Sequence, residues 1–294
     1  MDSPRELASA GLKLTYRSKG QVIKTSTLTA DALKPITRRP PAVTKNLDGK
    51  PLATPIQRPM AVRIRCAAPI ASAIDTLDVE LDVIEGRKTI GIKQSFAVES
   101  YVQQTALVFP FVGPGIVTQA GVTNGGHANR SGQFALDVVG LNEAYAIYGA
   151  PDKGKSADYA GWGRTIIAPA AGEVVASRAD RPDQPDPEKS DPAFHVPEFP
   201  SGGDPGNHLV ISHGHGEFSM MAHFQCGSML VRTGDRVAQG QPLGKLGSSG
   251  DTVTPHVHYQ LQAGPDWQFA DGLPMTFANV HARPLVRGAY FNSK

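Results

Sequence analysis

The sequence predicts a mainly β protein. Glycine and proline are frequent, with 31 and 24 residues among 294, and both residue types interrupt regular helices. Several stretches alternate polar and apolar residues, which is the period of a strand with one buried face. Stretches with helical period are few and short. We therefore expect strands joined by turns, with few helices.

The N-terminal part of the chain carries the strongest alternation. LKLTYRSKGQVIKTSTL predicts a hairpin that turns at Lys19 and Gly20, and the pattern continues in AVRIRCAAP, TLDVELDVIEGRKTIGIKQSFAV and TALVFPFVG. Val79, Leu81 and Val83 should face one way and the acidic residues between them the other, as in a half-buried strand. These observations predict a β-sandwich-like domain.

Two irregular stretches divide the rest of the chain. GPGIVTQAGVTNGGHANRSG, residues 113–132, is dense in small polar residues and predicts a linker or rim loop. We therefore place a boundary near Phe111, so that residues 1–111 form the sandwich-like domain and residues 112–294 a second domain. Residues 179–206 are rich in Pro and Asp, and so long a loop is usually functional, which makes it a candidate wall of a binding cleft.

Charge and composition exclude several classes of partner. The formal net charge is +2, and no block of like charge indicates a nucleic-acid or membrane patch. No apolar run approaches the ~20 residues of a membrane span, and MDSPRELASAG lacks the apolar core of a signal peptide. Cys66 and Cys226 form no ligand cluster; two buried free thiols are favoured, and a single bridge stays open.

The motif TPHVHYQLQ, residues 254–262, raises the first chemical question. Residues two apart in a strand share a face and lie about 6.5–7 Å apart, so His256, His258, Gln260 and Gln262 should point one way. Two imidazoles placed in this way can hold a metal, act as acid and base, or line a wet strand face. The spacing alone does not choose among these roles.

Two further stretches place functional side chains among apolar residues. FALDVVG is an apolar strand interrupted by Asp137, and a buried carboxylate is costly unless it is paired or bound to a metal. Strand parity predicts that Gln133 shares the face of Asp137. MMAHF supplies His223 on another apolar run. These residues become a candidate site only if the fold brings them together.

The order of these blocks resembles the LytM/lysostaphin-type zinc endopeptidases, which cleave peptides of bacterial peptidoglycan. The resemblance runs over FALDVV, TIIAPAAGEVVAS, GNHLVISHGHGEFSMMAHF and VRTGDRVAQGQPLGKLGSSGDTVTPHVHYQLQ. It implies an antiparallel β-sheet or barrel-like peptidase domain with an open groove. It also implies that Asp137 and His258 are zinc ligands and that His223 and His256 handle protons. A catalytic zinc takes about three protein ligands and lowers the pKa of a water to about 7.

One position departs from the family pattern. The family places its first ligand, a histidine, four residues before the aspartate, and Gln133 stands there in this chain. An amide oxygen is a poor zinc ligand beside an imidazole. His127, in the segment GGHANRSG, is the alternative source of the third ligand, although the sequence favours a solvated loop histidine at this position. Zinc occupancy is therefore an open question, and the third ligand is left between Gln133 and His127.

Three functional hypotheses remain. The leading one is a zinc endopeptidase acting on peptidoglycan peptide. The second is a catalytically degenerate domain of the same fold that binds peptidoglycan or regulates a cell-wall hydrolase, for which Gln133 is the evidence. The third is a biotinyl or lipoyl carrier, because TGDRVAQGQPLGKLG resembles half of such a hairpin, although no lysine stands between methionines. The resemblance implies a periplasmic or extracellular location.

Overall fold

The computed structural model describes residues 7–33, 37–38, 43–45, 51–56, 61–62, 74–85, 87–98, 101–121, 127, 130–149, 154–194, 203–281 and 285–294. These residues are mainly strands, as the sequence predicts, and the strand pairs within the sheets are antiparallel. The chain divides into two compact units, Met1–Ser100 and Tyr101–Lys294. No helix in the described part of the chain is long and apolar enough to cross a membrane.

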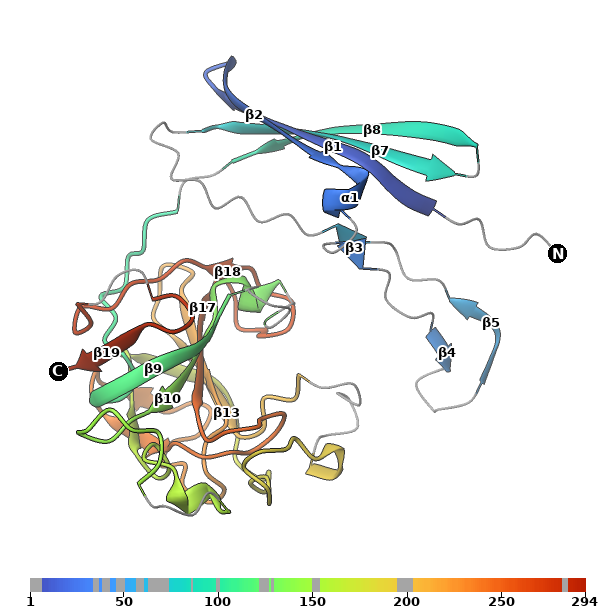
Figure 1. The fold of residues 1–294 in the computed structure, drawn as a ribbon. Coiled ribbons are helices and arrows are strands. Elements are labelled where there is room, and N and C mark those ends of the chain that lie inside the picture. The colour runs from blue at the N-terminus through green and yellow to red at the C-terminus, as the bar shows by residue number, and fades with distance from the viewer. Residues whose placement is uncertain are drawn as a thin grey trace. The chain divides into compact units, whose positions relative to one another are not determined.

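The first unit contains a four-stranded sheet. Its strand order is β2-β1-β7-β8, and the short helix α1 (Ala30–Leu33) follows β2 (Figure 1). The described residues hold only this one multi-stranded sheet in the unit, so they contain no second large layer of the expected sandwich. Two short strand pairs, β3 with β6 and β4 with β5, complete the described elements. The strands are β1 (Leu7–Ser18), β2 (Gln21–Thr29), β3 (Thr37–Arg38), β4 (Val43–Lys45), β5 (Pro51–Ile56), β6 (Ala61–Val62), β7 (Thr76–Glu85) and β8 (Lys88–Ala97).

The alternation in this unit has the predicted consequences. Lys19 and Gly20 both have positive φ at the turn between β1 and β2, as a tight hairpin requires. Val79 and Leu81 pack against a buried cluster that includes Leu33. Glu80 lies between them in sequence and forms ion pairs with two lysines on neighbouring strands, Lys13 and Lys93.

The second unit is built around a nine-stranded sheet. Its order is β15-β12-β13-β14-β17-β10-β9-β19, with β18 paired to β17. A separate pair, β11 with β16, lies outside this sheet. The strands are β9 (Gly113–Ala120), β10 (Leu136–Gly140), β11 (Thr165–Ile167), β12 (Gly172–Arg178), β13 (His208–Ser212), β14 (Phe218–Ala222), β15 (Arg236–Val237), β16 (Pro242–Lys245), β17 (Val257–Gln262), β18 (Gly272–Leu273) and β19 (Tyr290–Ser293). The 3₁₀ turns are η3 (Ser131–Phe134), η4 (Ser156–Asp158) and η5 (Pro192–Phe194).

Two predictions about the start of the second unit were wrong. The stretch predicted as a linker begins with β9, where a side chain at Gly115 would meet the rings of Phe111 and Phe291 at 3.0 Å, so glycine here serves close packing. The predicted strand TALVFPFVG is irregular; Leu107 forms a single bridge to Phe277. Its aromatic residues Phe109 and Phe111 are nevertheless 0% exposed and belong to the core.

The break between the units therefore lies before Phe111, at Ser100 and Tyr101. The Glu217 carboxylate fixes this entry segment, because it accepts hydrogen bonds from the Tyr101 hydroxyl at 2.5 Å and from the backbone N–H of Gln104 at 2.7 Å and Thr105 at 2.8 Å. Burial alone raises the pKa of Glu217, but these hydrogen bonds lower it below its usual value.

The cysteines differ in part from expectation. Cys226 is a free and exposed thiol, whereas the composition favoured buried thiols. Cys66 lies outside the described residues, so its state stays a prediction.

The core contacts predict where the chain can be shortened. A chain that starts at Ser100 should melt cooperatively, because it keeps the whole core of the second unit. A chain that starts at Gly113 loses the core residues Leu107, Phe109 and Phe111. Each lost core side chain costs about 2–5 kcal/mol of unfolding free energy, so the total loss is as large as the stability of a whole domain, about 5–15 kcal/mol. This chain should therefore show no cooperative melt. Differential scanning calorimetry of both chains tests this; a cooperative melt of equal Tm in both would contradict it.

Candidate functional site

The centre of the site is set by the register between β10 and β17. Asp137 on β10 is the direct partner of His258 on β17, and His258 in turn is the partner of Ala222 on β14. Val257 and Tyr259 flank His258 in sequence and are 1% and 0% exposed in the core beneath the sheet. The predicted two-residue period of this strand is therefore confirmed, and it leaves His258 on the face opposite the core.

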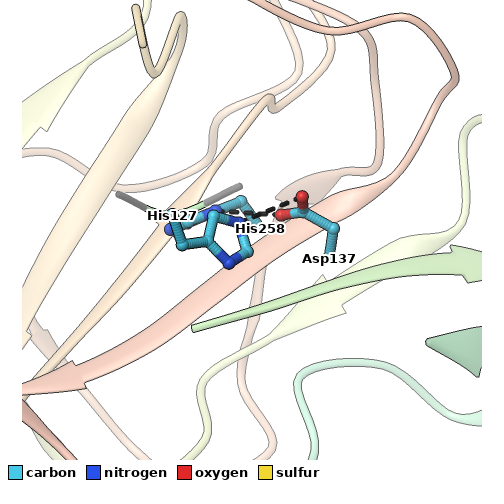
Figure 2. A group of neighbouring side chains, drawn as sticks. All are labelled: His127, Asp137 and His258. Atoms are coloured by element: carbon cyan, nitrogen blue, oxygen red, sulfur yellow. Dashed lines mark hydrogen bonds and ion pairs between the residues drawn. The ribbon is translucent and has the colours of Figure 1, made fainter. Parts of the chain in front are cut away.

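His127, Asp137 and His258 form the one group of potential metal ligands among the described residues. Their ligand atoms lie within 4.8 Å of one another. His127 Nε2 is 3.0 Å from Asp137 Oδ2, and His258 Nδ1 is 2.9 Å from Asp137 Oδ1. Figure 2 shows both imidazoles directed at the carboxylate, and the two rings meet edge to face at 4.8 Å. Two imidazoles and one carboxylate are a ligand set that zinc accepts.

His127 reaches this group from outside the strands of the sheet. Its backbone has φ of 46°, a left-handed conformation that few residues other than glycine adopt. Its Nδ1 is buried without a hydrogen-bond partner, so the ring makes its polar contact only through Nε2. A strained backbone and an unpaired ring nitrogen are both costly, and such costs concentrate at functional sites.

Gln133 lies outside this group, and the expectation that it shares a strand face with Asp137 was wrong. Gln133 belongs to the turn η3, and β10 begins only at Leu136, so strand parity does not extend back to it. Its side-chain amide donates a hydrogen bond of 2.9 Å to the Gly272 carbonyl oxygen. Gln133, which stands where the family has a histidine, therefore hydrogen-bonds to β18 and does not reach the carboxylate of Asp137.

Several contacts support this hydrogen bond to β18. The Gly272 N–H donates to the Arg130 carbonyl oxygen at 3.2 Å, and the Arg130 guanidinium forms a two-pronged ion pair with Asp271. A Cβ at Gly272 would lie 2.3 Å from the Ser131 carbonyl oxygen, so only glycine allows this approach. Residues 130–133 are therefore anchored to the start of β18.

His223 and His256 stand beside the ligand group. Their ring centroids are 4.6 Å apart, and His256 Nε2 is 3.5 Å from Asp137 Oδ1. His223 Nδ1 donates to the Ser249 carbonyl oxygen at 2.8 Å, and His256 Nδ1 donates to the Thr254 carbonyl oxygen at 2.6 Å. Because a carbonyl oxygen can only accept, each ring carries a proton on Nδ1 and leaves Nε2 free to exchange one.

The backbone of His223 is also strained. It has φ of 67° just after β14 ends. Hydrogen bonds on both sides hold it there: its N–H donates to the Pro205 carbonyl oxygen at 3.1 Å, and the Gly247 N–H donates to its own carbonyl oxygen at 3.1 Å. This left-handed residue is fixed by its neighbours, which is the condition under which strain persists at a site.

The pKa values of Asp137, His223 and His256 are all shifted from their usual values. Burial alone raises the pKa of Asp137, but the charge of His256 and the hydrogen bonds from the three histidines hold it well below its usual range. Burial lowers the pKa of His223 well below its usual value, and the charges of His256 and His258 lower it further. Burial also disfavours the charged form of His256, but the Asp137 charge and hydrogen bond outweigh it and raise its pKa.

The long segment predicted as a cleft wall packs beside His223. Gln184 donates to the Gly250 carbonyl oxygen at 2.5 Å, and the Asp251 carboxylate accepts from the Ser190 hydroxyl at 2.7 Å. Gly250 has φ of 80°, and a Cβ there would lie 2.4 Å from the Gly206 nitrogen, so this approach also requires glycine. The described part of the segment, residues 179–194 and 203–206, holds the turn η5 and a single bridge between Asp183 and Ser249 but no strand, as predicted.

Sequence reasoning missed the groups that orient the histidines. The carbonyl groups of Ser249 and Thr254 act through the backbone, so their side chains give no signal. Gln260 accepts from His258 Nε2 at 3.0 Å, and here the signal was present, because the strand period places Gln260 on the face of His258.

Residues 153–268 match Peptidase family M23. This range includes His223, His256 and His258, whereas His127 and Asp137 precede it. Two curated relatives from Vibrio cholerae serotype O1 match over 56 residues: the peptidoglycan DD-endopeptidase ShyC at 42% identity and the peptidoglycan DD-endopeptidase ShyA at 38%. The match covers 19% of this chain but only 12% of ShyC and 13% of ShyA.

Solved structures of M23 proteins are also similar to this chain. The catalytic domain of a mutant of the prophage-encoded M23 protein EnpA from Enterococcus faecalis aligns with a TM-score of 0.35 and 21% identity, covering 57% of this chain and 93% of that chain. The catalytic domain of lysostaphin from Staphylococcus simulans aligns with a TM-score of 0.31 and 17% identity, covering 55% of this chain and 88% of that chain.

The divergent pKa values of the two histidines predict an ordered titration. At pH 6.5, the ordinary pKa of histidine, metal-free protein should hold His256 mainly charged and His223 neutral, because one pKa is raised and the other lowered. Nitrogen-15 NMR of the imidazole rings across pH should show His256 losing its charge at the higher pH and a proton on His223 Nδ1. A cationic His223 at pH 6.5 would contradict this order.

Proposed function

Since residues 153–268 form a domain of peptidase family M23, we propose that this chain is a zinc-dependent endopeptidase that hydrolyses peptide bonds of bacterial peptidoglycan. The observation that carries the proposal is the convergence of His127, His258 and His256 on the carboxylate of Asp137. The curated relatives named as peptidoglycan DD-endopeptidases support peptidoglycan peptide as the substrate class. Such a substrate implies action in the periplasm or outside the cell.

The ligand group fits zinc by its chemistry. His127, Asp137 and His258 offer two imidazole nitrogens and one carboxylate oxygen within 4.8 Å of one another, and three protein ligands leave a tetrahedral ion one open position. Zinc held there would supply Lewis-acid polarisation of the peptide carbonyl and lower the pKa of a water molecule. The pKa of Asp137, which lies well below its usual range, keeps the carboxylate charged and ready to bind a cation.

His223 and His256 are suited to move protons. Each has its Nδ1 proton held by a backbone carbonyl oxygen, so Nε2 is the nitrogen that accepts or donates. The neutral form favoured at His223 suits a general base, which removes a proton from the attacking water. The charged form favoured at His256 suits a donor that stabilises the developing oxyanion.

A second candidate function keeps the fold but not the hydrolytic activity. A degenerate domain that binds peptidoglycan or regulates a cell-wall hydrolase is favoured by Gln133, which stands where the family has a histidine. The position of His127 is the counter-argument, because it brings a second imidazole to Asp137 from elsewhere in the chain. A muropeptide digestion assay separates the two, since only the enzyme yields new chain ends.

The source of the third ligand gives a direct test. His127→Ala should remove zinc binding, because it deletes one of three ligands. Gln133→His should not tighten zinc binding and should lower Tm, because the amide that braces Gly272 is lost. Elemental analysis and competition with a chelator measure both. Zinc retained in His127→Ala, or tightened in Gln133→His, would assign the third ligand to position 133 instead.

The different roles proposed for the histidines give a second test. His223→Ala should reduce hydrolysis by about 100-fold or more, the scale of a lost general acid or base, with zinc content unchanged. His258→Ala should lose both zinc and hydrolysis. His215→Ala, which changes an exposed turn residue, is the matched control and should retain both. Equal loss of zinc in His223→Ala and His258→Ala would show that the roles are divided wrongly.

A further inference from the structure

A row of buried side-chain amides leads away from His258 along β17. His258 Nε2 lies 3.0 Å from Gln260 Oε1, Gln260 Nε2 donates to Gln262 Oε1 at 2.5 Å, and Gln262 Nε2 donates to the Gly264 carbonyl oxygen at 2.6 Å. Gln260 is 2% exposed and Gln262 is 0% exposed. Buried amides are costly unless paired, and here each amide is paired at both ends.

The far end of the row fixes its direction. The Gly264 carbonyl oxygen can only accept, so Gln262 must turn its amide N–H₂ group toward it and its oxygen toward Gln260. The same reasoning turns the oxygen of Gln260 toward His258. The ring nitrogen that faces this oxygen must donate, so the proton of His258 belongs on Nε2. In the neutral ring, Nδ1 on the side of Asp137 is then left with its lone pair, whereas a cationic ring would donate from both nitrogens.

The tautomer of His258 with its proton on Nδ1 competes with the tautomer that the glutamine row favours. Asp137 Oδ1 lies 2.9 Å from His258 Nδ1 and can accept a proton from that nitrogen. Without an acceptor at Nε2, the carboxylate would favour the tautomer with the proton on Nδ1, and that nitrogen could not bind a metal. The glutamine row supplies the opposing hydrogen bond, and partners of this kind raise metal affinity by fixing ligand tautomers.

We propose that Gln260 and Gln262 are positioning residues that hold the proton of His258 on Nε2 and so present Nδ1 to the zinc site. The inference rests on the proposed function, which makes His258 a zinc ligand. It goes beyond that function, because it assigns roles to two buried glutamines that touch neither metal nor substrate. The strand period explains their placement, since residues 258, 260 and 262 share one face of β17.

The test measures zinc affinity and proton position in the full chain. Gln260→Met keeps the side-chain length and removes the acceptor, and we expect its Kd for zinc, measured by calorimetry with a competing chelator, to rise about 10–100-fold. Nitrogen-15 NMR of wild-type protein, metal-free and zinc-loaded, should show a slowly exchanging proton on His258 Nε2. The same proton should be lost or exchange rapidly in Gln260→Met.

Two further variants separate this role from simple packing. Gln260→Glu retains an oxygen that accepts from His258, so the proton on Nε2 should persist and zinc affinity should return toward wild type. Tyr259→Phe removes a buried hydrogen bond to Ser219 on the opposite face of the same strand and should leave zinc affinity unchanged. Weakening of zinc binding by Tyr259→Phe equal to that by Gln260→Met would overturn the positioning role.

The NMR measurement of the His258 proton in wild-type protein tests the inference even if a variant fails to fold. A proton on His258 Nδ1 in zinc-loaded wild type, together with muropeptide digestion, would overturn this inference and leave the proposed function intact. If wild type binds no zinc but carries a Gln260-dependent proton on Nε2, the proposed function is overturned and the proton assignment is supported. Zinc affinity within twofold of wild type in a folded Gln260→Met would also overturn the inference.

Discussion

The whole site depends on the carboxylate of Asp137. Its two oxygens are shared among imidazoles that come from different parts of the sequence, His127 on Oδ2 and His256 and His258 on Oδ1. Burial alone would favour the protonated carboxyl group, but the charge and hydrogen bonds of the histidines keep it ionised. One negative charge thereby orients three imidazole rings, and in the proposed function it is also the anionic ligand of the zinc ion.

The sheet gives this carboxylate its place. Asp137 and His258 are cross-strand partners, and the residues on either side of His258 fill the core. A shift of register by one residue would move the histidine into the core and Tyr259 onto the site face, so packing of the apolar residues specifies the position of the polar ones. The same face continues into Gln260 and Gln262, whose amides reach a fixed backbone carbonyl group. The rigid half of the site is therefore the strand itself.

The other half comes from segments with costly backbone geometry. His127 and His223 both have positive φ; the His127 side chain is held by Asp137, and the His223 backbone by Pro205 and Gly247. Residues 130–133 are braced against the start of β18, and residues 183–190 and 203–206 pack on the turn that binds His223. Strain at His223 is tolerated because hydrogen bonds to its own N–H and carbonyl groups determine the backbone on each side. The costly backbone conformations therefore lie at residues whose side chains meet in the site.

The sequence by itself determined the strand-rich class, the hairpin at Lys19 and Gly20, and the two faces of β17, because alternation and turn residues act over a few positions. It also singled out Asp137 and the histidines through the order of the family's motifs. Only the tertiary structure decided that His127, and not Gln133, lies at the carboxylate, that β9 replaces the expected linker, and that the units divide before Phe111. These outcomes depend on contacts between distant segments, such as Gln133 with Gly272 and Phe111 with Phe291, and a local pattern carries no information about which distant partner a side chain will meet.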